Sequence, residues 1–164
     1  MSPWGVQVYV GLGSNLNDPV AQVRQGLRAL AQLPRSRLVQ ASRLYCSPPM
    51  GPPDQPDYIN AVAALDTALE PEPLLDALQA IEVRQGRRRG VRWGARTLDL
   101  DILLYGSRCL SGPRLNVPHP GLDQRAFVIH PLAEIAPEAV VPGRGTAAEL
   151  ARHCPKGGLQ LLDQ

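Results

Sequence analysis

Apolar and β-branched residues gather in four short stretches that predict β-strands. The first, residues 6–10 (VQVYV), runs into the glycine-rich string 11–15 (GLGSN), which predicts a turn directly after the strand. Residues 36–46 predict a second strand. The stretches 58–69 (YINAVAALDTAL) and 98–105 (LDLDILLY) predict the third and fourth.

Two other stretches repeat their apolar residues at helical spacing. One follows Asn17 or Asp18 as the cap, has Pro19 at its first position and is stopped by Pro34. The other begins at Glu72 and carries Gln79 and Glu82 on one face, three residues apart, with Gly86 as a plausible stop.

The predicted order is therefore β-α-β-β-α-β, which is typical of a ferredoxin-like α+β fold: an antiparallel sheet with both helices packed on one face. Residues 106–164 are less periodic and are expected to form a C-terminal extension. Within it, residues 117–127 predict a loop and residues 147–154 a short helix.

The length of 164 residues predicts one domain, 1–164, with one core. The chain is 44% hydrophobic and 20% charged, and no apolar run approaches the ~20 residues that a membrane span needs. No export signal is visible, so we expect a cytoplasmic protein.

Three scattered cysteines predict neither disulfides nor a zinc site. Nothing in the sequence demands more than a monomer.

Two carboxylates, Asp99 and Asp101, stand two positions apart in the last apolar strand, so both leave the same side of the sheet about 6.6 Å apart. Buried carboxylates repel one another unless a cation lies between them. Oxygen ligands suit Mg²⁺, and two ions about 4 Å apart could be bridged by such a pair. The alternative is that both acids belong to the wet face of an edge strand.

A basic loop precedes this pair. The segment from Arg84 to Arg96 contains six arginines and no acidic residue. One arginine guanidinium can bind two phosphate oxygens at once, so such a loop is suited to bind phosphate groups. A solvated surface loop is the alternative. Because Lys156 is the one lysine in the chain, a general bias toward arginine in the composition would explain the cluster equally well. Trp93 in this loop indicates a flat partner such as a base.

The proline-rich string 48–57 (PPMGPPDQPD) predicts a stiff loop, suited either to line a pocket or to connect elements at the surface. Residues 11–16 do not complete a dinucleotide-binding GxGxxG, and no phosphate-binding P-loop motif is present. His119 and Arg125, which flank another proline-containing loop, are compatible with phosphate contact.

Several strings, in this order, closely resemble the 6-hydroxymethyl-7,8-dihydropterin pyrophosphokinase family of folate biosynthesis. They are GLGSNL (11–16), SPPMGPPDQPDYINAV (47–62), RWGARTLDLDILLY (92–105), VPHP (117–120) and QRAFVIHPLAEIAPE (124–138). The resemblance covers nearly the whole chain. It implies transfer of pyrophosphate from ATP, the co-substrate, to the hydroxymethyl group of a pterin, with two Mg²⁺ ions as cofactors.

The resemblance also implies roles for individual residues. Asp99 and Asp101 would hold the metal ions, and Arg87 and Arg96 would assist transfer. The residues implied to bind the pterin are Ser47, Pro48, Pro49, Met50, Tyr58, Asn60, Trp93, Asp99 and Phe127, with the rings of Tyr58 and Phe127 on its two sides. The residues implied to bind ATP are Gln79, Glu82, Arg89, Arg92, Trp93, Arg96, Ile102, Arg114, Asn116, His119 and Arg125.

The chain departs from the family pattern at three places. The basic loop is one residue shorter, which leaves open whether Arg88 or Arg89 takes the inner position. Pro120 stands where an aromatic residue is common, and Asn116 replaces a hydroxyl residue.

Two other functions are open on the residues alone. One is a nucleotidyltransferase or another DxD enzyme with a different acceptor, and the other is an RNA-binding module, which the 4% aromatic content disfavours. Small-molecule substrates are thus expected, with neither nucleic acid nor membrane as partner.

Overall fold

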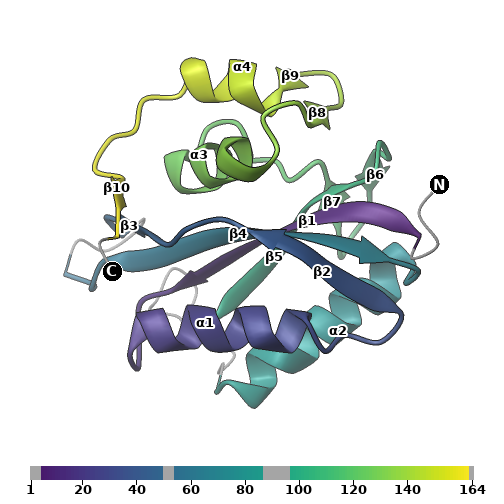
Figure 1. Cartoon of the computed structure of the whole chain (residues 1–164), viewed down its shortest axis with the longest axis horizontal. Coiled ribbons are helices and arrows are strands. Elements are labelled where there is room, and N and C mark those ends of the chain that lie inside the picture. Colours follow the sequence, from purple (N-terminus) through teal and green to yellow (C-terminus); the bar gives the residue numbers. More distant parts are fainter. Residues whose placement is uncertain (1–4, 50–53, 87–96, 163–164) are drawn as a thin grey trace.

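An antiparallel sheet of six strands forms the centre of residues 5–49, 54–86 and 97–162, the parts of the chain that this computed structural model describes (Figure 1). Its strands are β1 (Val6–Ser14), β2 (Ser36–Ala41), β3 (Tyr45–Ser47), β4 (Tyr58–Thr67), β5 (Asp99–Tyr105) and β10 (Gln160–Leu161). They are ordered β10-β3-β4-β1-β5, and β2 also pairs with β4. The long strands β4 and β1 thus lie in the middle.

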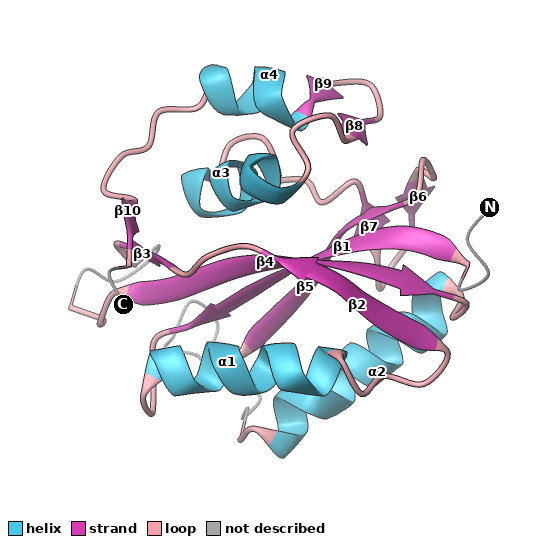
Figure 2. Ribbon diagram, viewed as in Figure 1, coloured by secondary structure: helices cyan, strands magenta, loops and turns pink. Residues whose placement is uncertain are grey.

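Helices cover both faces of the sheet (Figure 2). The helices α1 (Pro19–Leu30) and α2 (Pro71–Arg84) lie on one face, while α3 (Ala126–Ile135) and α4 (Ala147–Arg152) lie on the other. Two small hairpins complete the described fold: β6 (Leu110–Ser111) with β7 (Asn116–Val117), and β8 (Val140–Val141) with β9 (Gly145–Thr146). The predicted mixed α and β composition and the antiparallel sheet are confirmed.

The start of α1 follows from its first residues. The Asp18 side chain accepts a hydrogen bond from the backbone N–H of Ala21, and Pro19 occupies the first helical position. A carboxylate cap satisfies one of the backbone donors that a helix start leaves without a partner, and proline has no N–H to lose there. Of the two caps that the sequence allows, Asn17 and Asp18, the structure uses Asp18.

The alternation of residues along β1, β4 and β5 creates two cores. The side chains of Val10, Ala61 and Leu100 belong to the core beneath α1 and α2. Tyr9 and Val62 belong to the smaller core beneath α3. Because successive side chains of a strand point to opposite faces, one set of strands supports both layers.

Three predicted elements differ from the structure. The first strand continues through 11–14 instead of turning there, because its glycines lie in the sheet as part of β1. The predicted strand 36–46 is broken into β2 and β3 at residues 42–44. The tail contains α3, a helix that its sequence does not predict because it is apolar on most sides and has Pro131 in its interior.

Along the described stretches, no helix combines the length and the apolar character that crossing a bilayer requires.

Candidate active site

A pocket opens where the end of β1 meets β4 and β5, under the first turn of α3. It brings together nine of the residues predicted from the sequence: Ser47, Pro48, Tyr58, Asn60, Asp99, Asp101, His119, Arg125 and Phe127. The rest of its lining consists of Gly11, Leu12, Gly13, Ala61, Leu103 and Val128. The two carboxylates therefore face a cavity, and Tyr58 and Phe127 line the same cavity.

The floor of this pocket is the glycine end of β1. Gly13 is paired with Asn60 on β4 and with Asp99 on β5, and Gly11 is paired with Asp101. With strands about 4.8 Å apart, Asn60 and Asp99 stand about 10 Å from each other across Gly13. A Cβ at Gly13 would lie 3.3 Å from the Asn60 amide nitrogen, so a larger residue would crowd the floor.

The side-chain amide of Asn60 is buried and held in one orientation. The Ser47 hydroxyl donates a hydrogen bond of 2.7 Å to Asn60 Oδ1. Ser47 is paired with Tyr58 on the adjacent strand, so β3 and β4 present the hydroxyl, the ring and the amide together. Such a fixed donor and acceptor edge is suited to reading the edge of a heterocycle.

The opposite wall comes from the start of α3. Arg125 is the residue just before the helix, and Phe127 is the second residue within it. The Arg125 side chain lies over Gly121, where an added Cβ would come within 2.6 Å of Arg125 Nε. The turn 119–125 therefore needs a glycine at this point to admit the guanidinium to the pocket wall.

His119 is held in one tautomer. Its backbone N–H donates to the carbonyl of Leu103, and its Nδ1 accepts a hydrogen bond of 3.1 Å from the N–H of Gly121. Burial, reinforced by the positive charge of Arg125, lowers the pKa of His119 below its ordinary value, while Asp99 opposes the change. The neutral ring thus carries its proton on Nε2 and can donate it to an oxygen.

A second cavity adjoins the first and shares Asp101 and His119 with it. Its other lining residues are Leu75, Leu100, Ile102, Arg114, Leu115, Asn116 and Pro120. It thus collects Ile102, Arg114 and Asn116, three residues predicted to bind ATP. The two cavities are separated by residues from β5 and from the segment after β7.

Two residues predicted to bind ATP lie on α2 outside both linings, and their surroundings differ. Gln79 is exposed and accepts a hydrogen bond from Arg114, which also pairs with Glu72 and Asp76. Glu82 is only 5% exposed, and its Oε2 accepts a 2.7 Å hydrogen bond from the backbone N–H of Leu100. Glu82 therefore fixes β5 between the two aspartates.

Pro49 is partly buried and follows Pro48, but it does not line the pocket. The remaining predicted site residues lie outside the described ranges: Met50, Arg87, Arg88, Arg89, Arg92, Trp93 and Arg96. The pocket floor at Gly11 and Gly13 is not predicted from the sequence. Their spacing of two, in phase with the strand before them, is the signal that could have revealed it.

The carboxylate pair offers oxygen ligands only. Among the described residues no three His, Cys, Asp or Glu side chains converge as a ready metal site. Mg²⁺ commonly takes one or two carboxylates and completes its shell with phosphate oxygens and water, so Asp99 and Asp101 fit this ion as a substrate-assisted site.

Asp99 lies in a ring-lined pocket, and Asp101 is shared by that pocket and a second cavity, an arrangement typical of an enzyme of the transferase class that acts on two small molecules. Residues 9–137 match the family described as 7,8-dihydro-6-hydroxymethylpterin-pyrophosphokinase (HPPK), and the chain belongs to this family.

Known relatives share this family, and a solved structure shares the fold. The chain is 54% identical over 156 residues to the 2-amino-4-hydroxy-6-hydroxymethyldihydropteridine pyrophosphokinase of Pseudomonas aeruginosa, covering 95% of this chain and 96% of the relative. It is 52% identical over 147 residues to the enzyme of the same name from Haemophilus influenzae, covering 90% and 92%. The wild-type HPPK-DHPS of Plasmodium falciparum with pteroate shares the fold, with a TM-score of 0.70 at 11% identity. That match covers 90% of this chain and 44% of the other, so this chain spans less than half of it.

Proposed function

We propose that this protein transfers the pyrophosphoryl group of ATP to the hydroxymethyl group of 6-hydroxymethyl-7,8-dihydropterin, as the names of its relatives indicate for them. The observation that carries the proposal is the sharing of Asp101 and His119 by two cavities. The acceptor occupies the cavity between Tyr58 and Phe127, the nucleotide occupies the other, and the reacting atoms meet beside Asp101.

In the reaction, the pterin hydroxymethyl oxygen attacks the β-phosphorus of ATP in line with the leaving oxygen. A bond forms from that oxygen to the β-phosphorus, the bond from the β-phosphorus to the α,β-bridging oxygen breaks, AMP leaves, and the hydroxyl proton is released. Phosphoryl transfer asks little covalent work of protein groups, so positioning and neutralisation of charge supply most of the rate. No side chain is assigned as a general base.

Recognition of the pterin uses the pocket wall and floor. Tyr58 and Phe127 stack on the two faces of the ring, and the Asn60 amide pairs with its edge beside Ser47. The flat floor at Gly13 leaves room for the ring. Backbone groups near Pro48, Pro49 and Met50 complete the edge contacts. Trp93 is proposed to border the site.

Recognition of ATP uses the second cavity. Ile102 lines it beside Arg114 and Asn116, and the Nε2–H of His119 donates to a phosphate oxygen. Arg125 lines the first cavity and adds positive charge close to His119. The remaining residues proposed to bind or assist the nucleotide are Gln79, Glu82, Arg87, Arg89, Arg92, Trp93 and Arg96.

Asp99 and Asp101 are proposed to hold two Mg²⁺ ions. When bound, these ions supply neutralisation of the triphosphate and of the charge that develops during transfer. The role of the chain is to place both carboxylates on one face of β5, which the alternation of the strand and the Glu82 bond at Leu100 achieve.

The strand order β5-β1-β4, with β2 and β3 beyond β4, supports the finer assignment of a ferredoxin-like fold. Residues 106–164 form its C-terminal extension. A single domain, a monomeric state and a cytoplasmic location remain predictions.

The proposal is tested by incubating the protein with ATP, MgCl₂ and 6-hydroxymethyl-7,8-dihydropterin and separating the nucleotides by chromatography. We expect AMP and a pterin diphosphate, and loss of activity when EDTA removes the metal. Release of inorganic pyrophosphate with a nucleotidylated acceptor would instead support nucleotidyl transfer.

Asp99→Asn and Asp101→Asn each keep the side-chain size and remove the charge, and each is expected to lower the rate by at least roughly 100-fold. Asp66→Asn is the matched control, because Asp66 is a strand carboxylate eight residues along β4 from Tyr58, about 27 Å away. Equal losses in the three variants would overturn the assignment of the aspartates.

A further inference from the structure

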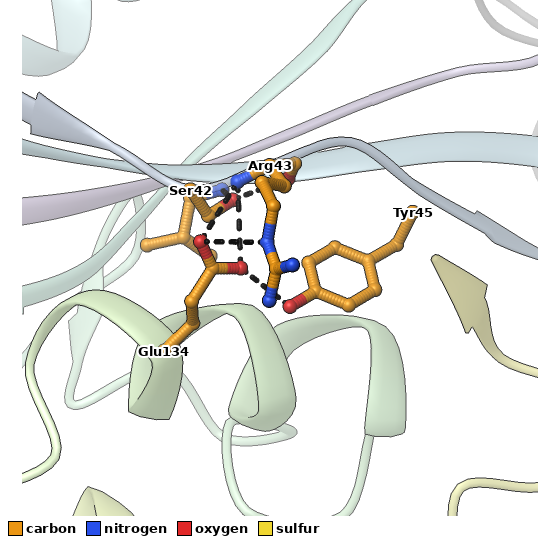
Figure 3. A network of polar contacts seen from close by, with 5 residues as sticks. Ser42, Arg43, Tyr45 and Glu134 are labelled. Atoms are coloured by element: carbon orange, nitrogen blue, oxygen red, sulfur yellow. Dashed lines mark hydrogen bonds and ion pairs between the residues drawn. The ribbon is translucent and has the colours of Figure 1, made fainter. Parts of the chain in front are cut away.

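Glu134, the penultimate residue of α3, joins this helix to the segment between β2 and β3 (Figure 3). The backbone N–H of Arg43 donates to both of its carboxylate oxygens, at 3.4 and 3.1 Å, and Arg43 Nε lies 3.4 Å from Oε2. The Tyr45 hydroxyl donates to Oε1 over 2.5 Å. One carboxylate thus receives donors from two residues of a single short segment.

The segment that carries the partners of Glu134 is itself bonded to the sheet through Ser42, the residue before Arg43. Ser42 donates its backbone N–H to the carbonyl of Val62, and its hydroxyl accepts a hydrogen bond from the N–H of Val62. Burial, and then the hydrogen bond to Glu134, raises the pKa of Tyr45 to about 12, so its hydroxyl remains a donor at neutral pH. The carboxylate is therefore bound to a segment that is itself hydrogen-bonded to β4.

The two elements that Glu134 joins carry opposite walls of the acceptor pocket. Phe127 lies seven residues before Glu134 on α3, which is two turns and places both on one side of the helix, about 10 Å apart. On the other side of the contact, the chain runs two residues from Tyr45 to Ser47, which is paired with Tyr58. The position of the Phe127 ring relative to Tyr58 therefore depends on this contact.

An acid at this place is unfavourable for the helix alone. Glu134 is in the last turn of α3, where the helix dipole disfavours a negative charge, and its side chain is only 22% exposed. Pro131 lies between it and Phe127 and removes a backbone hydrogen bond from the helix interior. Ile129 holds the helix against the sheet by apolar packing, and the hydrogen bonds to Glu134 add a directional contact.

We propose that Glu134 is a positioning residue that sets the gap between Phe127 and Tyr58 and thereby tunes binding of the flat acceptor. This inference rests on the proposed function, because it takes the pterin as the occupant of the gap. It assigns no contact between Glu134 and a substrate. The expected signature is selective: affinity for the pterin falls, while affinity for the nucleotide is kept.

The test compares the full-length protein with Glu134→Gln, which keeps the size and loses the charge. Binding of the pterin is measured by calorimetry in the presence of a non-hydrolysable MgATP analogue, and steady-state kinetics are recorded for both substrates. We expect the pterin Kd and KM to rise about tenfold, with kcat and the KM for ATP changed by less than about threefold.

Two further variants separate positioning from general stability. Tyr45→Phe removes one donor to Glu134 and is expected to raise the pterin Kd in the same direction, but less. Asp66→Asn breaks the Arg37–Asp66 ion pair, which joins β2 to β4 far from the pocket, and is expected to leave the pterin Kd unchanged even where it lowers the melting temperature.

The outcomes distinguish the two proposals. If the parent protein does not bind the pterin, the proposed function fails. If the parent binds it and Glu134→Gln binds it equally well, or loses pterin and nucleotide affinity to the same degree, Glu134 is a structural residue only and the inference is overturned. Should Glu134→Gln not fold, Tyr45→Phe decides between these outcomes by the same comparison of pterin and nucleotide binding.

Discussion

The Ser47 hydroxyl donates to the side-chain carbonyl oxygen of Asn60 over 2.7 Å, at a place where both residues are buried. In this arrangement the hydroxyl occupies the carbonyl oxygen of Asn60, and the NH₂ group lies on the other side of the amide, near Gly13. The hydrogen bond therefore holds the side chain of Asn60 in place at the pocket floor before any ligand arrives.

Removing this hydroxyl should weaken recognition of the acceptor. We expect Ser47→Ala to raise the pterin Kd about 5- to 10-fold, because the buried Asn60 carbonyl loses its hydrogen-bond partner and the side chain is held less firmly. Ser47→Thr keeps the hydroxyl and serves as the control, with affinity within about twofold of the parent. Calorimetric titration with pterin checks both; equal affinity of the alanine and threonine variants would contradict the prediction.

The buried carboxylate of Glu82 should matter for stability as well as for the site. Glu82→Ala leaves the N–H of Leu100 without its acceptor, and we expect the free energy of unfolding in urea to fall by about 1–3 kcal/mol. Glu82→Gln retains an oxygen acceptor and should lose less. A variant that keeps full stability but loses nucleotide binding would show that contact with ATP, and not support of β5, is the main role of Glu82.

Tyr45 predicts a specific alkaline dependence of stability. Its pKa in the folded protein, about 12, lies above its ordinary value of 10.0, so the unfolded chain releases the proton first as pH rises. The stabilising contribution is therefore complete below pH 10 and is lost as pH rises through 12. Tyr45→Phe removes this contribution.

The measurement is urea unfolding of the parent and of Tyr45→Phe at several pH values between 9 and 11, each about half a unit apart. The advantage of the parent should shrink as pH rises, and the other tyrosines cancel because they are present in both proteins. A difference in unfolding free energy that stays constant over this range would mean that Tyr45 titrates normally.

The alternation of residues along the strands predicts most of the candidate site. A period of two places Tyr58 with Asn60 and Asp99 with Asp101 on single faces, and in the structure all four line one pocket. Phe127 could be associated with them only through family resemblance, because its helix α3 is neither clearly amphipathic nor free of proline.

What could not be predicted depends on contacts between distant segments. Glycines at 11 and 13 indicate a turn when the sequence is taken locally, and only pairing with β4 and β5 on both sides keeps that stretch extended. The break at residues 42–44 likewise depends on Glu134, 91 residues away from Arg43, which supplies acceptors for a backbone that leaves the sheet. No local propensity encodes such a partner.

The alternation along β1, β4 and β5 has a practical consequence for engineering. Ile59 belongs to the core beneath α1 and α2, while its neighbours Tyr58 and Asn60 line the pocket. Thermostability and acceptor selectivity can thus be engineered independently. Libraries of variants for thermostability belong on the sheet face that packs against α1 and α2, and libraries for new acceptors belong on the face that lines the pocket.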